Sequence, residues 1–467
     1  AALPAFTATY AGFVNGDTTA VVSGLSPATT AIPSSPAGSY PITASGATAA
    51  NYSLTFVSGT LTVGQTLLTI TADNKTKTYG ATLPAFTASY AGLLNGDTPS
   101  VVTGLQFGTA ASASSNVGTY AITLFGGTSS SYTLAYVSGV LTINPAALTI
   151  TANNASRAFG AANPLFTATL AGLVNGDASS VVNGLLLGTS ATASSAAGSY
   201  PITASGATAQ NYTINFVPGT LTVAQNFLTI TADNKTKAYG APLPAFTATY
   251  AGLLNGDTPG VVTGLQFSTT ASVGANVGTY TITPFGATAP NYALVYVPGA
   301  LTITSAALTI TANNATRIYG AANPVFGATY SGFANGDTTS VVSGLTISTP
   351  ATAASNVGSY PVTPSGATAA NYTIAYVPGT LGVTPAPLTV TAASASKTYG
   401  TANPAFSAGY SGFVNGDTPV VVGGLTLNTP ATVVSGVGAY AITPGGATAP
   451  NYTLTFVPAT LTLNPAP

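Results

Sequence analysis

The sequence predicts an all-β protein built as a linear tandem array of six small β-sandwich domains of about 80 residues, Ig-like or β-grasp-like. Two observations lead to this fold class. The sequence repeats itself every 80 residues without an insertion. Within each copy, short runs rich in Val, Ile, Thr and Tyr alternate with turn signals, as small all-β domains do. About 80 residues can enclose a core of their own, so we expect separate domains rather than thin solenoid coils.

Four short motifs define the period. Asn-Gly-Asp recurs six times, with its Asp at Asp17, Asp97, Asp177, Asp257, Asp337 and Asp417. An aromatic-Gly pair (Tyr79-Gly80), a Gly-x-Tyr (Tyr120) and an Asn-Tyr (Asn211-Tyr212) recur at the same spacing, and the last becomes Ser131-Tyr132 once. The predicted domains are repeat 1 (1–65, lacking its first strand), repeat 2 (66–145), repeat 3 (146–225), repeat 4 (226–305), repeat 5 (306–385) and repeat 6 (386–467).

Repeat 2 serves to predict the elements in order. Residues 67–71 and 85–90 alternate apolar with polar residues and predict two strands. Asn95-Gly96 is a turn signal. Asp97 followed by Thr-Pro has the pattern of a helix N-cap with Pro in the first turn, which predicts one short helical turn ending near Val102.

The second half of the repeat predicts three more strands. Residues 119–124 form the first, and 132–137 and 140–143 are expected to form a hairpin around Ser138-Gly139. Later copies carry Pro-Gly at this turn, which is the signature of a type II turn.

The composition excludes many functions. The chain carries seven Lys or Arg and eight Asp, for a net charge of −1 and 3% charged residues. Binding to nucleic acid or anionic lipid through a basic patch is therefore not expected. Without His, Cys or Glu, zinc sites, thiol nucleophiles, Ser-His-Asp triads and Glu-based acid/base pairs cannot form. We expect no enzyme and no cofactor. Apolar runs are too short for a spanning helix, so no membrane span is expected either.

Three motifs have a functional and a structural interpretation. The six Asp residues of Asn-Gly-Asp are weak calcium candidates, but calcium takes six to eight oxygens, and a turn with an N-cap explains the same residues better. The Lys residues raise the idea of a Lys–Asn isopeptide bond, yet several repeats have no Lys, so solvated loop charge is the preferred interpretation. Tyr120 and Tyr132 could form a glycan-stacking ladder, but buried rings with hydroxyls tied to backbone are favoured.

Several motifs, taken together in order, resemble the MBG domain. They are Lys-x-Tyr-Gly (77–80), Pro-x-Phe-Thr (84–87), Asn-Gly-Asp (95–97), Val-Gly-x-Tyr (117–120), Asn-Tyr (211–212) and Gly-x-Leu-Thr-Val (219–223). MBG domains and their YDG relatives occur in tandem in large secreted bacterial proteins similar to filamentous-haemagglutinin-like adhesins. The resemblance covers the whole chain. It implies a bacterial, exported stalk, attached to the cell surface or shed, and supplies no catalytic residues.

The predicted function is that of a non-enzymatic structural protein, secreted or on the bacterial cell surface, acting as a rod-like stalk or a self-associating filament. A net charge near zero favours association. The alternative is an adhesin whose repeated Ser/Thr-rich loops bind glycans, receptors or a cell surface.

The ends of the chain leave two interpretations open. Residue 1 aligns with residue 81, so repeat 1 lacks 13 residues that would hold its first strand and aromatic-Gly pair. The absence of Met and of a leader indicates a piece of a longer product. Either the chain is a window on a longer array, or a neighbouring subunit donates the missing strand to repeat 1.

Overall fold

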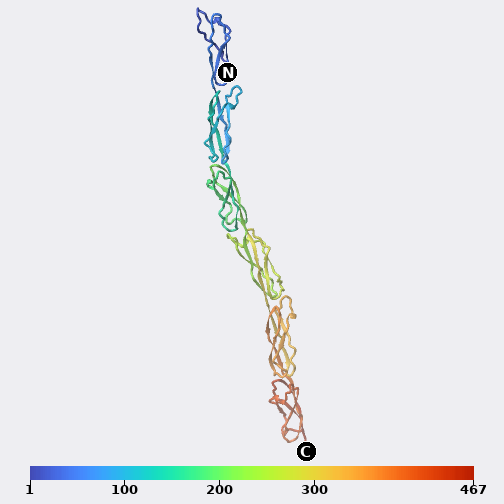
Figure 1. Cartoon of the computed structure of the whole chain (residues 1–467). Helices are drawn as coiled ribbons and strands as arrows, with labels where there is room; N and C mark the ends of the chain where they lie inside the picture. The colour runs from blue at the N-terminus through green and yellow to red at the C-terminus, as the bar shows by residue number, and fades with distance from the viewer. The chain divides into compact units, whose positions relative to one another are not determined.

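A computed structural model describes all residues, 1–467, as β-strands joined by loops and short 3-10 turns. Figure 1 shows the chain coloured from blue at the N-terminus to red at the C-terminus, with a small bundle of strands in each successive colour band. The chain divides into two compact units, Ala1–Asn226 and Phe227–Pro467.

Repeat 2 contains one complete set of elements. They are β4 (Thr66–Ala72), β5 (Lys75–Thr78), β6 (Ala88–Ala91), η2 (Pro99–Val101), β7 (Gln106–Gly108), β8 (Gly118–Phe125), β9 (Tyr132–Val137) and β10 (Gly139–Asn144). The strands form two sheets, one of three strands in the order β6-β4-β9 and one of four in the order β5-β10-β8-β7. These sheets make a small β-sandwich, so the predicted fold class is confirmed.

The core lies between the two sheets and follows from the alternation in the sequence. Leu68 and Ile70 of β4 face inward from the three-stranded sheet, and both are fully buried. Ile122 of β8 and Leu141 and Ile143 of β10 meet them from the four-stranded sheet, each at most 1% exposed. Burying one such side chain contributes about 1.5–3 kcal/mol, so these inward rows supply much of the stability of a repeat.

Repeats 3 to 6 copy this arrangement. Repeat 3 contains β11 (Ala146–Ala152), β12 (Ala155–Ala158), β13 (Ala168–Ala171), η3 (Ser179–Val181), β14 (Leu186–Gly188), β15 (Gly198–Ser205), β16 (Tyr212–Val217) and β17 (Gly219–Ala224). Repeat 4 contains β18 (Asn226–Ala232), β19 (Lys235–Ala238), β20 (Ala248–Ala251), η4 (Pro259–Val261), β21 (Gln266–Ser268), β22 (Gly278–Phe285), β23 (Tyr292–Val297) and β24 (Gly299–Thr304). Repeat 5 contains β25 (Ala306–Ala312), β26 (Ala315–Ile318), β27 (Ala328–Ser331), η5 (Thr339–Val341), β28 (Thr346–Ser348), β29 (Gly358–Ser365), β30 (Tyr372–Val377) and β31 (Gly379–Thr384). Repeat 6 contains β32 (Ala386–Ala392), β33 (Ala395–Thr398), β34 (Ala408–Ser411), η6 (Pro419–Val421), β35 (Thr426–Asn428), β36 (Gly438–Gly445), β37 (Tyr452–Val457) and β38 (Ala459–Asn464).

Repeat 1 has a smaller set of elements. It contains η1 (Thr19–Val21), β1 (Ser26–Thr29), β2 (Gly38–Ser45) and β3 (Gly59–Val63), and its strands form a single three-stranded sheet. Residues that align with β6 and β9 form no strand here, because the strand that would lie between them is absent from residues 1–65. The inward residues Ile42, Leu61 and Val63 are consequently only half-buried.

The first predicted strand, the strand at 119–124 and the helical turn are confirmed as β4, β8 and η2. The strand predicted at 85–90 begins later, at Ala88, where it pairs with Ala72 of β4. Residues 85–87 follow Pro84 and form no strand. The analysis missed β5 and β7, two short strands whose partners are distant in sequence and whose residues show little apolar alternation.

The predicted hairpin around Ser138-Gly139 is wrong. β9 pairs in parallel with β4, whereas β10 pairs antiparallel with β8 and in parallel with β5, so the chain passes from one sheet to the other at this point. The type II turn is wrong too, because it needs a positive φ at Gly, and neither Gly139 nor its counterparts in later repeats have one. A Cβ atom at Gly139 would instead collide with the carbonyl oxygen of Ala72. Glycine is required here for close backbone approach.

The joint between successive repeats

The Asn-Gly-Asp triplet forms the predicted turn, but its Asp does not cap the helical turn. Asn95 has a left-handed φ of 52°, and the Asp97 N–H donates to the Leu94 carbonyl at 2.9 Å. The N-cap residue of η2 is Thr98. The Asp97 carboxylate faces elsewhere and accepts a hydrogen bond from the Tyr132 hydroxyl at 2.6 Å.

This Tyr–Asp pair joins the Asn-Tyr motif to the Asn-Gly-Asp motif inside each repeat. The hydroxyl–Oδ2 distance is 2.6–2.8 Å in all six copies, Tyr52–Asp17, Tyr132–Asp97, Tyr212–Asp177, Tyr292–Asp257, Tyr372–Asp337 and Tyr452–Asp417. The same hydroxyl accepts the N–H of a residue in the turn, as Tyr212 does from Val174 at 3.0 Å. Burial, and then the bond to Asp177, raise the pKa of Tyr212 above its ordinary value. The phenol stays protonated and ties the turn to the strand.

The aromatic-Gly motif completes the cluster from the preceding repeat. The Tyr79 hydroxyl of repeat 2 donates to Oδ2 of Asp177 in repeat 3 at 3.2 Å. The rings of Tyr79 and Tyr212 pack edge to face, with centroids 5.5 Å apart and an interplanar angle of 79°. Both rings are at most 7% exposed. One carboxylate therefore receives a tyrosine from each side of the joint.

An asparagine pair forms a second link across the same joint. The Asn211 side chain accepts the Val117 N–H of repeat 2 at 3.0 Å through Oδ1 and donates through Nδ2 to Oδ1 of Asn116 at 2.8 Å. Both bonds join segments that are 94 or 95 residues apart. A side-chain amide satisfied on both ends permits few orientations, so it fixes rotation at the joint as well as separation.

The glycine of the aromatic-Gly pair allows the two repeats to approach closely. Gly80 has a φ of +82°, and a Cβ atom there would lie 2.6 Å from Cγ2 of Val174. Any side chain would push the turn of repeat 3 away and lengthen the Tyr79–Asp177 hydrogen bond. Gly240 and Gly320 stand in the same way against Ala334 and Val414.

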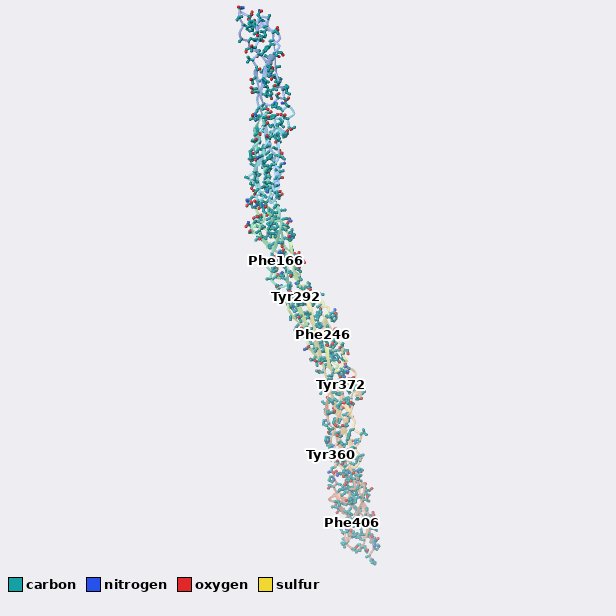
Figure 2. The ribbon with its side chains drawn as sticks, viewed as in Figure 1. Phe166, Phe246, Tyr292, Tyr360, Tyr372 and Phe406 are labelled. Carbon is teal, nitrogen blue, oxygen red and sulfur yellow. The ribbon has the colours of Figure 1, made fainter.

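The complete set of links occurs at three joints, each within one unit. Repeats 4 and 5 are joined by Tyr239–Asp337 at 3.1 Å and by Asn371 on Asn276 and Val277, and repeats 5 and 6 by Tyr319–Asp417 at 3.2 Å and by Asn451 on Asn356 and Val357. Tyr372, labelled in Figure 2, is the central ring of the joint between repeats 4 and 5. Hydrogen bonds to a charged acceptor contribute about 1.5–3 kcal/mol each.

The prediction of solvated loop charge is wrong for three of the five Lys residues. Lys77, Lys237 and Lys397 are 6–7% exposed, and Arg157 and Arg317 occupy the same position in repeats 3 and 5. The Lys77 ammonium donates to the carbonyls of Ala81 and Ala113, both at 2.9 Å. Burial lowers the pKa of this ammonium. The cation points inward from the edge strand β5 and pins two loops.

The Asp residues gave weak calcium candidates, and the structure places each of them in a tyrosine cluster. Nowhere in the chain do three or more acidic side chains gather in the manner of a metal site. One carboxylate per repeat, already shared by two hydroxyls at the complete joints, falls well short of the six to eight oxygens that calcium takes.

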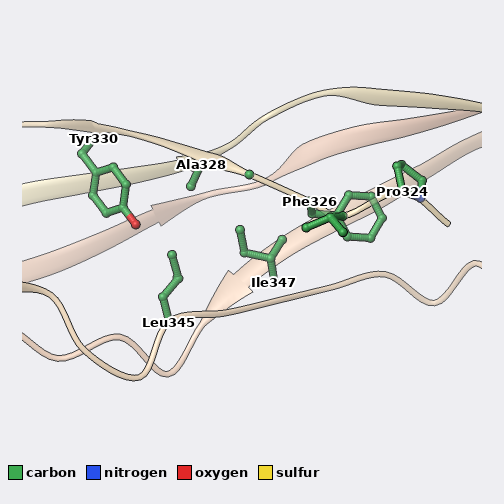
Figure 3. A pocket seen from close by; sticks show the side chains of 8 residues that line it. Pro324, Phe326, Ala328, Tyr330, Leu345 and Ile347 are labelled. Atoms are coloured by element: carbon green, nitrogen blue, oxygen red, sulfur yellow. The ribbon is translucent and has the colours of Figure 1, made fainter. Parts of the chain in front are cut away.

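Repeat 5 has an open seam between the edges of its two sheets. A cavity of about 510 Å³ lies between the segment 324–330 and β28, and Figure 3 shows Phe326, Tyr330, Leu345 and Ile347 around it. In repeat 2 the same seam is filled by Phe86 and Phe107, whose ring centroids are 6.2 Å apart. The lining of the cavity in repeat 5 has no charged side chain.

The geometry defines a class of protein, a tandem array of β-sandwich repeats whose recurring motifs serve structure and joints. The family model described as MBG domain (YGX type) matches residues 1–62, 68–142, 148–222, 228–302, 308–382 and 388–462. The chain belongs to this family, as six tandem copies.

Other comparisons add little. No curated protein matches the chain. Among solved structures it is similar to the crystal structure of Drosophila N-cadherin EC1-4, at 8% identity and a TM-score of 0.17, over 57% of this chain and 82% of that one. A TM-score this low carries no argument. The structure holds no long apolar helix of the kind that crosses a bilayer.

Proposed function

We propose that the chain is a non-enzymatic, extracellular structural protein of bacterial origin, a stalk that sets the distance between whatever its two ends carry. The observation that carries this proposal is the use of the repeated motifs. Asn-Gly-Asp, aromatic-Gly and Asn-Tyr all meet at the joints, so the polar groups common to the repeats serve to hold neighbours in place. Membership of the MBG family agrees with an exported protein.

The test is the dependence of reach on repeat number. A compact domain of this size spans roughly 30–40 Å. Removing residues 146–225 from the full chain should shorten individual particles in electron micrographs by about that length and leave their width unchanged. Particles of unchanged length, or rounded particles in both samples, would contradict the stalk.

The second candidate function is adhesion through the Ser/Thr-rich loops. These loops are exposed, for example Ser112 and Ser114 in repeat 2, and they recur on every complete repeat. Their hydroxyls already bond one another, as Ser112 Oγ does with Ser114 Oγ at 3.2 Å. Binding of the full chain to a glycan array, abolished by Ser→Ala changes in these loops, would favour the adhesin, whereas a blank array favours the stalk.

Strand donation to repeat 1 is also a proposal that a feature of residues 1–65 supports. A cavity of about 270 Å³ lies among Leu3, Ile32, Leu61, Asp97 and Tyr132. At the complete joints the equivalent space receives the tyrosine of the aromatic-Gly pair. A peptide with the sequence 68–80 should therefore bind the full chain and protect the amides of β3 from hydrogen exchange. An absence of binding would rule out donation.

A further inference from the structure

Each complete repeat has four sheet edges, and three of them are protected. An exposed edge strand offers unpaired backbone groups to another chain, and proteins block this with short strands or inward-pointing charges. In repeat 2, β6 has four residues and β7 has three. The third edge, β5, carries the buried cation Lys77, which points inward from the strand.

The fourth edge has none of these devices. It is formed by β9 and by its counterparts β16, β23, β30 and β37, here called the β9-type strands. Each has six residues, the longest edge of its repeat, and none contains a charged residue or a proline. Large apolar side chains are exposed at its end, with Tyr136 at 39% and Val137 at 46% in repeat 2.

We propose that the β9-type strands are the surface through which two copies of this chain associate side by side, pairing edge to edge in antiparallel register. The proposal rests on the structural function proposed above and names its partner, a second copy. A β9-type edge is self-complementary under a two-fold axis, because antiparallel pairing offers each strand the same donors and acceptors that it presents.

The charge distribution favours a second copy as the partner. The net charge is −1 over 467 residues, so two chains approach without appreciable repulsion. An uncharged edge offers nothing to steer a charged partner, whereas the exposed Tyr and Val side chains of two antiparallel edges can cover one another. Five such edges along the chain make even a weak pairing effective through multivalency.

The experiment places one Lys on each edge of the full chain. The edge variant carries Thr133→Lys, Thr213→Lys, Ala293→Lys, Thr373→Lys and Thr453→Lys, all at the second residue of a β9-type strand. The control adds the same charge to an exposed row of an interior strand, through Thr119→Lys, Ser199→Lys, Thr279→Lys, Ser359→Lys and Ala439→Lys. Circular dichroism verifies that both variants fold.

Sedimentation across a concentration series measures association. We expect the unmodified chain to self-associate, the edge variant to lose at least tenfold in association constant relative to the control, and amides of residues 133–137 to exchange more slowly in the associated state. Equal losses in both variants, protection that maps to another strand, or an unmodified chain that stays monomeric would overturn the proposal. Edge pairing can fail while the stalk stands, because reach is measured on single particles.

Discussion

The buried cation shows how one residue position carries two alternative designs. In repeats 3 and 5 it is Arg, whose Nε donates to Asn163 and Asn323 at 2.7 and 2.8 Å. Repeats 2 and 4 combine Lys with Leu83 or Leu243 at the position of that Asn. Repeat 6 mixes the two designs, since Lys397 donates only to backbone carbonyls while Asn403 still donates to the Ala431 carbonyl at 2.8 Å.

We therefore predict that Lys397→Arg stabilises repeat 6. The new guanidinium would donate to Oδ1 of Asn403 as Arg157 does to Asn163, a hydrogen bond worth about 1 kcal/mol. Hydrogen exchange of β33 in the full chain measures the change. Lys77→Arg is the matched control and should bring no gain, because Leu83 offers no acceptor; equal effects at both sites would refute this account.

The joint tyrosines predict a loss of stability in alkali. The pKa values of Tyr212, Tyr372 and Tyr452 are raised above 10.0, with burial as the largest cause. The folded chain holds these protons more tightly than the unfolded chain, so their contribution is complete below the unfolded pKa and is lost as pH rises through the folded pKa. Denaturant unfolding above about pH 10 should show this decline.

A variant with Tyr212→Phe, Tyr372→Phe and Tyr452→Phe isolates these groups. Its stability should be lower at neutral pH and should depend less steeply on pH in alkali. Lys77, whose pKa burial lowers, changes stability in the opposite sense and is common to both proteins. An unchanged slope in the variant would show that the tyrosines are not responsible.

Metal removal should leave the protein unchanged. Because the Asp carboxylates accept hydrogen bonds from tyrosines, EDTA is expected to leave the melting temperature as it is. A large drop on chelation would instead assign the Asn-Gly-Asp residues to calcium.

At the scale of elements, the seam between the two sheets offers a direct test of packing. Ile347→Phe in repeat 5 should rebuild the aromatic pair that Phe246 and Phe267 form in repeat 4 at 6.1 Å. Such pairs contribute about 0.5–1.5 kcal/mol beyond the area they bury. Exchange protection of β28 and β29 should rise, while Phe267→Ile should lower it in repeat 4. A loss in both variants would mean that the seam of repeat 5 has no room for the ring.

The elements also show where prediction from sequence succeeds. Strands with apolar alternation, such as β4 and β8, were found because their inward residues report burial directly. β5 was missed because its inward residue is Lys77, whose burial depends on carbonyls supplied by two distant loops. The supposed hairpin failed because Gly139 looks like a turn residue, although it serves close contact with Ala72.

The joint could be predicted only in part for the same reason. All three motifs that build it were evident from their period, and Asn-Gly-Asp was correctly assigned to a turn. No local pattern indicates that the Asp of one repeat accepts a hydrogen bond from a tyrosine 98 residues earlier. The available signal was that these motifs recur without any catalytic or metal-binding residue beside them.

At the scale of the whole molecule, the central claim is that the joints hold neighbouring repeats in a fixed geometry. The chain contains no cysteine, so spin labels can be placed at Thr279→Cys and Ser359→Cys, two exposed positions on opposite sides of the joint between repeats 4 and 5. Tyr239→Phe with Asn371→Ala removes both side-chain links of that joint.

Electron–electron resonance between these labels in the full chain measures the distribution of their separation. We predict a single narrow distribution in the chain with intact joints and a clearly broader one after Tyr239→Phe and Asn371→Ala. A broad distribution in the intact chain, or one that the two substitutions leave unchanged, would contradict the account.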